Sequence, residues 1–139
     1  MPLHPRLVHF PIALLVLGTI AALWHAWRHQ PLWLKDWGRL SLFTGWLLTI
    51  PALITGLIDK SKLTADSAAA QLADRHTTAI FGMWILYGLA LYWQMRWGRD
   101  MNQRQRWQWT ALLLAATGIL LLAGHWGGQL VYELGVGVQ

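Results

Sequence analysis

The sequence contains no cysteine and few charged residues. Both features limit the kinds of site and the class of protein that it can form. Only 12% of its 139 residues are charged, whereas 55% are hydrophobic and 11 are tryptophan. Without cysteine there is no disulfide, no thiolate metal site and no covalent attachment of a c-type haem. A soluble domain of this length would not stay soluble with so apolar a surface. We therefore expect one membrane domain over residues 1–139, with histidine and carboxylate as the available metal ligands.

The sequence also lacks the motifs of several enzyme classes. It has no glycine-rich phosphate loop after a strand, no nucleophile elbow and no His-Glu-x-x-His helix. Charged residues do not line the middle of any apolar run, which disfavours a transporter. A net charge of +5 would suggest nucleic acid as a partner of a soluble protein, but the basic residues lie in short connections between apolar runs. They are interpreted as topology signals, and no nucleic-acid partner is expected.

Four apolar runs are long enough to cross a bilayer, which takes about 20 residues of helix. They are expected near residues 7–27, 40–58, 76–97 and 107–126. A capped, alanine-rich helix over residues 66–74 is expected to lead into the third run. The first run is too long for a signal peptide and lacks a small-x-small cleavage site, so it is expected to be retained. The predicted fold is all-α, an up-down bundle of four transmembrane helices.

Basic residues are distributed unequally between the two ends of this bundle. The connections after the first and third runs contain Arg28, Lys35, Arg39, Arg96, Arg99, Arg104 and Arg106. The opposite side contains Arg6, Lys60, Lys62 and Arg75. The positive-inside rule then predicts that both termini lie outside, which for a bacterial inner (cytoplasmic) membrane means the periplasm.

Four of the six histidines fall at this outer end. His4 and His9 precede or open the first run, His76 opens the third, and His125 lies near the end of the fourth. Asp59 ends the second run on the same side. Histidine in a membrane segment is rare and usually faces protein or water, so the convergence predicts a ligand site. The competing interpretation is that these histidines only pack and form hydrogen bonds.

A b-type haem is the first ligand that this convergence suggests. Bis-histidine ligation needs two neutral imidazoles from different helices. The first and third helices of an up-down bundle are diagonal, so His9 and His76 can face each other across the core. His125 is a candidate third ligand, and Gly82 is one of the small residues that would leave room for the porphyrin.

Two other ligands remain open. Zinc or copper would use His4, His9 and His76 together with Asp59. A quinone site would instead form hydrogen bonds through histidine and aspartate, with tryptophan flanking the ring. At the inner end, His25 lacks a histidine partner on the other helices and is interpreted as an interfacial residue.

Several motifs together resemble a known bacterial family. They are His-Pro-Arg-Leu-Val-His-Phe-Pro at 4–11, Thr-Gly-Leu-Ile-Asp at 55–59, a histidine opening the third run, and Gly-Gly-Gln-Leu-Val-Tyr-Glu-Leu-Gly-Val-Gly-Val at 127–138. The chain resembles domain of unknown function 2231, a family of small predicted four-helix membrane proteins. Some members are joined to or encoded beside cytochrome c or Rieske-type modules, which implies a redox setting.

The resemblance carries over particular positions. His4, His9, Asp59 and His76 match the motifs of the family. The chain departs at Leu134, where many members have a histidine before Gly-Val-Gly-Val, and His125 is a candidate substitute.

The sequence therefore predicts an integral membrane protein that binds haem b and transfers electrons at the periplasmic face, rather than an enzyme with its own substrate. His9 and His76 would be the axial ligands, and Asp59 would orient one imidazole. Expected partners are membrane lipid, a periplasmic cytochrome c or other redox protein, and a second copy of the chain. The alternative is a non-catalytic membrane subunit or anchor of a redox complex.

Overall fold

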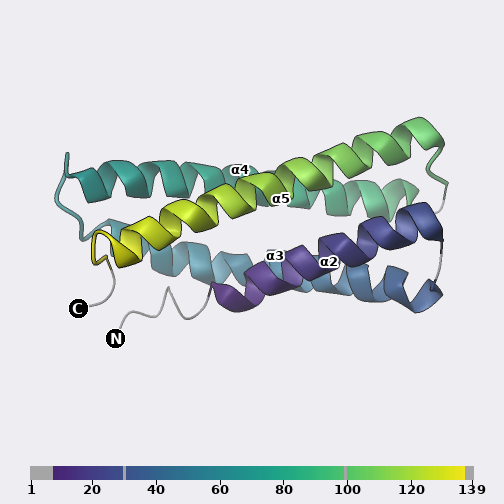
Figure 1. Cartoon of the computed structure of the whole chain (residues 1–139), viewed down its shortest axis with the longest axis horizontal. Coiled ribbons are helices and arrows are strands. Elements are labelled where there is room, and N and C mark those ends of the chain that lie inside the picture. The colour runs from purple at the N-terminus through teal and green to yellow at the C-terminus, as the bar shows by residue number, and fades with distance from the viewer. Residues whose placement is uncertain (1–7, 30, 99, 137–139) are drawn as a thin grey trace.

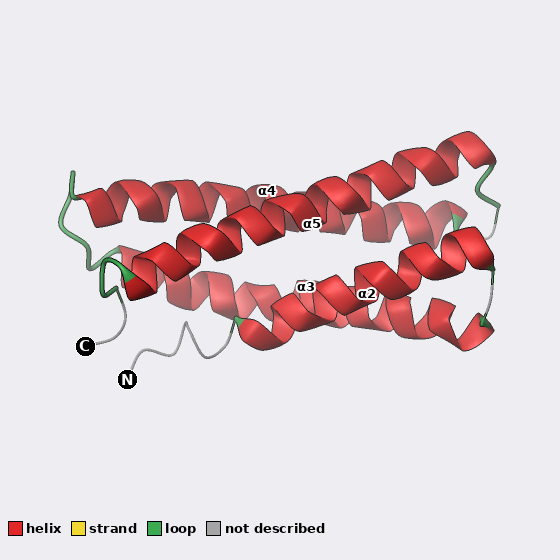
Figure 2. Ribbon diagram, viewed as in Figure 1, coloured by secondary structure: helices red, strands yellow, loops and turns green. Residues whose placement is uncertain are grey.

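The described part of the chain, residues 8–29, 31–98 and 100–136 of the computed structural model, forms a bundle of four helices without strands (Figures 1 and 2). The helices are α2 (His9–Arg28), α3 (Leu32–Lys60), α4 (Ala68–Trp97) and α5 (Gln103–Tyr132). Successive helices run in opposite directions, which confirms the predicted up-down order. We call the end where α2 begins and α5 finishes the terminal end, and the opposite end, with the α2–α3 and α4–α5 connections, the basic end.

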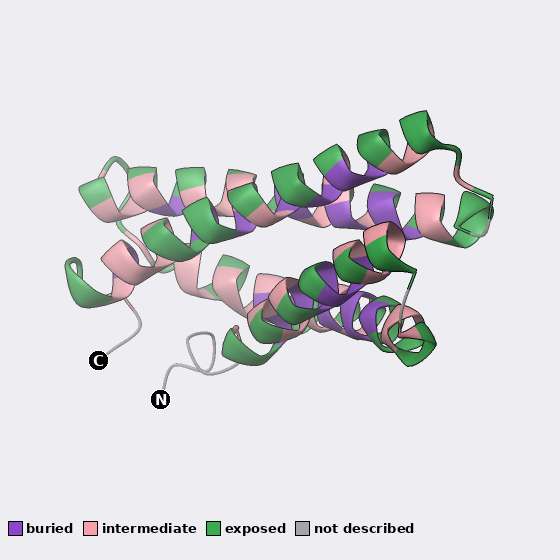
Figure 3. Cartoon of the chain, turned by 45° about the vertical axis from the view of Figure 1, so that its right-hand side comes forward, coloured by how far each residue is buried: buried purple, intermediate pink, exposed green. Residues whose placement is uncertain are grey.

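Three of the helices, α2, α3 and α5, are long and apolar enough to cross a membrane. The fourth, α4, has the same 30-residue length as α5 and packs along it. A membrane crossed by α5 would therefore also hold α4. Large apolar side chains such as Phe43, Ile85 and Leu121 are exposed on the outward faces, as expected for lipid contact. Figure 3 shows this division between exposed outer faces and buried inner faces.

Three helices extend beyond the predicted runs. The expected polar connection over 32–39 forms the first turns of α3. The alanine-rich segment and the third run form one helix, α4, capped by Ser67, whose side chain accepts a hydrogen bond from the backbone nitrogen of Ala70. The glycine-containing segment after residue 126, beyond the predicted fourth run, continues α5 as far as Tyr132. Hydropathy marks only the apolar core of a helix, whereas backbone hydrogen bonding continues through polar and glycine residues when neighbouring helices pack against them.

Small residues bring α2 and α3 into close contact. A Cβ added at Gly18 would lie 2.9 Å from the backbone nitrogen of Leu42, and one added at Gly38 would lie 2.9 Å from that of Ala22. Such positions let the backbones of two membrane helices approach closely. The α2–α3 contact and the α4–α5 contact are the most extensive in the molecule, so the bundle consists of two helix pairs.

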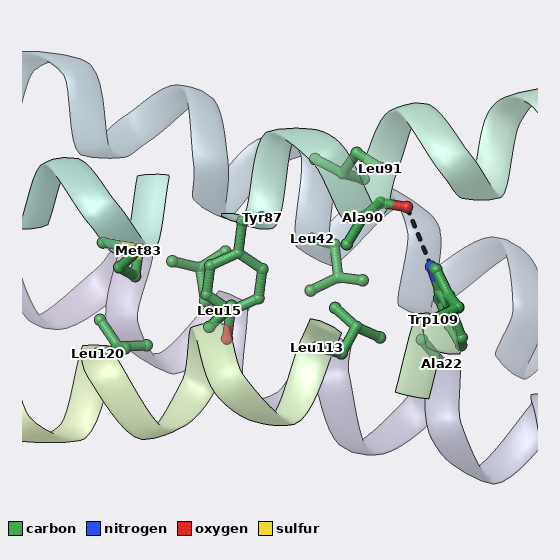
Figure 4. Packing of buried hydrophobic residues seen from close by; sticks show 11 residues of the cluster. Leu15, Ala22, Leu42, Met83, Tyr87, Ala90, Leu91, Trp109, Leu113 and Leu120 are labelled. Atoms are coloured by element: carbon green, nitrogen blue, oxygen red, sulfur yellow. Dashed lines mark hydrogen bonds between the residues drawn. The ribbon is translucent and has the colours of Figure 1, made fainter. Parts of the chain in front are cut away.

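A buried apolar cluster joins the two pairs at mid-length (Figure 4). It includes Leu15, Leu42, Met83, Tyr87 and Leu113. Trp46 of α3 also stacks on Trp84 of α4, with ring centroids 4.6 Å apart. These contacts close the centre of the bundle between its two ends.

Three hydroxyl groups meet inside this cluster. The Tyr87 hydroxyl lies 2.8 Å from Thr117 Oγ1 and 3.2 Å from Thr19 Oγ1. Each threonine donates its only hydroxyl proton to a carbonyl of its own helix, to Leu15 from Thr19 and to Leu113 from Thr117, at 2.8 Å in both cases. The single Tyr87 proton is therefore available to the nearer oxygen, Thr117 Oγ1, and this hydrogen bond connects α4 to α5.

Candidate functional site

A cavity of about 330 Å³ lies between the two helix pairs at the terminal end. We call it the terminal cavity. Its walls come from the first turns of α2 and α4 and the last turns of α3 and α5, and they are mostly apolar. The polar side chains on the wall include His9, Asp59, Lys60, His76 and Thr77.

His76 is held by the neighbouring helix. Its Nδ1 lies 2.8 Å from the backbone carbonyl oxygen of Ala123 on α5. Because a carbonyl only accepts hydrogen bonds, Nδ1 carries a proton and donates it. A Cβ added at Gly127 would lie 3.1 Å from His76 Cε1, so this glycine makes room for the ring. Metal-ligating histidines usually have one ring nitrogen held by such a partner.

His9 reaches the same cavity from the diagonal helix. It is the first residue of α2 and lines the cavity while remaining exposed at the rim. Extensive contacts link α2 to α3 and α4 to α5, and weaker ones link α3 to α4 and α2 to α5, so α2 and α4 are diagonal as expected. The structure thus brings His9 and His76 to one cavity.

The acidic residues at this rim are engaged with lysines. Asp59 lines the cavity and accepts a hydrogen bond from Lys62 at 2.9 Å. Lys60 forms an ion pair with Asp74 at 2.5 Å and so links α3 to α4. A carbonyl of α5 orients His76. Asp59 instead pairs with Lys62, three residues further along the chain.

Two predicted site residues lie away from the cavity wall. His125 is exposed on α5, between wall residues Gly124 and Gly127, because one helical step from Gly124 turns its side chain away. Gly82 is half-buried on α4 and does not line the cavity, and a Cβ added there would meet nothing within 4 Å. His4 lies outside the described residues.

The structure describes three of the four residues predicted to bind zinc or copper. His9, His76 and Asp59 line the terminal cavity, and His4 is the member outside the described range. In the part of the chain that the structure describes, no three histidine or carboxylate side chains are grouped closely enough to hold a metal ion.

Sequence reasoning missed most of the α5 side of the cavity. Gly124, Gly127, Gly128 and Val131 follow one another at helical spacing and all line the wall. The last three lie beyond residue 126, where the fourth run was expected to end, so their common face was not recognised. The signal present in the sequence is the spacing of these small residues, which continues the last apolar run beyond residue 126.

Comparison with known proteins gives one match. No curated protein and no solved structure matches the chain. A family model described as "Predicted membrane protein (DUF2231)" matches residues 1–139, which confirms the resemblance indicated by the motifs. The chain therefore belongs to the DUF2231 family of predicted membrane proteins.

Proposed function

We propose that the terminal cavity binds a b-type haem through His76 and His9, and that the protein transfers electrons at this face of the membrane. One observation carries the proposal, namely that histidines from two diagonal helices line the same mostly apolar cavity. Bis-histidine ligation uses two imidazoles, and histidines on two different helices could supply them. When bound, the haem supplies a one-electron redox centre whose potential depends on its ligands and on the polarity around it.

The hydrogen bond of His76 supports its use as an iron ligand. His76 Nδ1–H donates to the Ala123 carbonyl, which fixes the direction of the ring. Metal-ligating histidines usually donate their other ring N–H to a carbonyl or carboxylate in this way.

Zinc or copper is supported less well than haem. Such a site takes three or four protein ligands, and the described residues contain no group of three. Asp59, the carboxylate predicted to complete the set, is paired with Lys62. A bis-histidine haem needs only the two imidazoles that line the cavity.

The distribution of basic residues supports the side of the membrane that this proposal gives to the cavity. The basic end would face the cytoplasm by the positive-inside rule, so the terminal cavity would face the periplasm of a bacterial inner membrane. Electrons would then pass between the quinone pool or a membrane partner and a periplasmic acceptor such as a c-type cytochrome.

The test is a reduced-minus-oxidised absorption spectrum of the detergent-purified protein, expressed with an adequate supply of haem. We expect sharp Soret and α bands from the wild type and their loss in His9→Ala and His76→Ala. His125→Ala is the matched control, because this histidine belongs to the same end but is exposed and does not line the cavity. Its spectrum should equal that of the wild type.

A featureless spectrum from helical, monodisperse wild-type protein would contradict the proposal. It would leave the non-catalytic subunit or anchor of a redox complex as the better explanation. Equal losses in His125→Ala and His76→Ala would instead show that the cavity does not define the site.

A further inference from the structure

A second cavity, of about 590 Å³, lies at the basic end of the bundle. We call it the basic cavity. Its walls come from the end of α2, the beginning of α3, the end of α4 and the beginning of α5. The charged side chains that line it are Lys35, Asp36, Arg39, Arg96, Asp100 and Arg106. Four cationic groups from three helices therefore face two carboxylates.

Most of this positive charge is not paired with a carboxylate. Asp36 forms a long ion pair with Arg39, at 3.7 Å. The guanidinium groups of Arg96 and Arg106 lie over tryptophan rings instead, 5.5 Å and 5.7 Å from the ring centroids. Among the described residues, Lys35, Arg96 and Arg106 have no salt bridge to a carboxylate. The cavity thus has an excess of cationic donors available to an anion.

Two polar atoms buried at the wall of the basic cavity also lack a partner. His25 Nδ1 and Gln94 Oε1 have no hydrogen bond within the described residues. Both atoms are shielded from solvent, so the charged side chains of the wall, and not these two atoms, are the groups that a ligand in the cavity would contact.

The basic cavity lies at the level of an aromatic belt. Trp97 and Trp109 line it, and Trp27, Trp93 and Trp107 lie on the adjoining turns of the same helices. Tryptophan is enriched where the hydrocarbon of a bilayer meets its headgroups. A cationic cavity at this level is positioned for the phosphate of a lipid headgroup, and basic pockets between transmembrane helices are known to bind such groups.

We propose that the basic cavity binds a phosphate group, held by Lys35, Arg96 and Arg106. Arginine and lysine bind phosphate oxygens through charge-assisted hydrogen bonds. This phosphate chemistry is shared by an anionic glycerophospholipid headgroup and by free phosphate. The site is independent of the proposed haem, because the buried mid-length cluster separates the two cavities.

The experiment measures lipid retention by the purified full chain in native mass spectrometry. The probes are phosphatidylglycerol, phosphatidylcholine as the zwitterionic comparison, and inorganic phosphate. We expect phosphatidylglycerol to be retained over phosphatidylcholine, and the preference to fall roughly tenfold in an Arg96→Gln/Arg106→Gln variant. Arg104→Gln is the matched control, because Arg104 is exposed on α5 and does not line the basic cavity.

A second double variant separates loss of charge from loss of folding. An Arg96→Lys/Arg106→Lys variant retains the charge, so it should keep most of the preference even where the glutamine variant folds poorly. Millimolar inorganic phosphate that raises the thermal stability of the wild type, without selective lipid retention, would support the phosphate site and assign it to the free ion. Equal retention of both lipids by the wild type, together with no phosphate effect, would overturn the proposal. A loss of lipid preference in Arg104→Gln as large as that in Arg96→Gln/Arg106→Gln would also overturn it.

Discussion

The two ends of the bundle are built from the same four helices but enclose cavities of opposite character. The terminal cavity is mostly apolar, and α5 contributes Gly124, Gly127 and Gly128 to it. The basic cavity is polar, and the same helix contributes Arg106 and Trp109. Helix packing provides space at both ends, so the side chains facing that space determine the class of ligand. We therefore propose a haem for the apolar cavity with two histidines and a phosphate group for the cationic one.

The closed centre keeps the two ends distinct. Met83 and Leu120 belong to the buried cluster and also line the terminal cavity, whereas Trp109 belongs to the cluster and lines the basic cavity. Each cavity therefore ends on the same core. Substitutions can consequently be chosen that affect both ends, one end or only the centre.

The largest loss of stability is expected from a substitution that separates α2 from α3, because both helices line both cavities. Gly18→Ala would place a Cβ 2.9 Å from the Leu42 backbone, so α2 and α3 must separate, and overpacking of this kind costs about 1–3 kcal/mol. Reversible unfolding in mixed micelles would measure the loss. Gly118→Ala is the control, because nothing lies within 4 Å of a Cβ there. It should be neutral or stabilising by up to about 1 kcal/mol, and equal losses in both would contradict close α2–α3 packing.

A substitution at Gly127 should affect the terminal end alone. In Gly127→Ala the new methyl would lie 3.1 Å from His76 Cε1 and displace the ring. Disturbing the groups around a ligating histidine typically weakens binding by about tenfold or more. Haem titration of purified protein would show this loss, while phosphatidylglycerol retention should stay unchanged. Gly82→Ala, which meets nothing within 4 Å, should bind haem as the wild type does.

The hydroxyl cluster should make a smaller contribution, confined to the centre. Tyr87→Phe removes the donor between Thr19 and Thr117, but both threonines keep their bonds to carbonyls of their own helices. We expect a loss of about 1 kcal/mol in unfolding free energy. Tyr92→Phe provides the comparison, since Tyr92 is exposed. A loss in Tyr92→Phe as large as that in Tyr87→Phe would show that the cluster does not stabilise the bundle.

The ion pair at the terminal rim should have the smallest effect. Lys60 and Asp74 connect α3 to α4, but the Asp74 side chain is 65% exposed. Partly exposed pairs contribute about 0–1 kcal/mol, and salt weakens them. Asp74→Asn should therefore lower the unfolding free energy by no more than this, with a smaller difference from the wild type at high salt. A salt-independent loss of several kcal/mol would show that this contact is structural.

The sequence predicted the helices better than it predicted the cavities. Apolar runs and polar connections identify four helices in up-down order, and this order places His9 and His76 at one end. The carbonyl of Ala123 that holds His76 could not be predicted, because every residue has a backbone carbonyl and only packing selects one. His125 was grouped with the site by its position along α5, whereas its exposure depends on the rotation of that helix.

The basic cavity was missed for a different reason. Its arginines and lysine were interpreted only as topology signals, which accounts for their side of the membrane without placing them around a common space. His25 and His29 differ in this respect, because they are four residues apart, a spacing that puts side chains on one face of a helix. Their rings meet edge to face with centroids 6.4 Å apart.

The most direct test of the distinction between the two ends is haem content, measured by the pyridine haemochrome method on three purified proteins. These are the wild type, His76→Ala, and Arg96→Gln/Arg106→Gln. The account predicts roughly one haem per chain in the wild type and in the arginine variant, because one bis-histidine site binds one haem, and almost none in His76→Ala. A wild type without haem, or equal loss of haem in both variants, would contradict it.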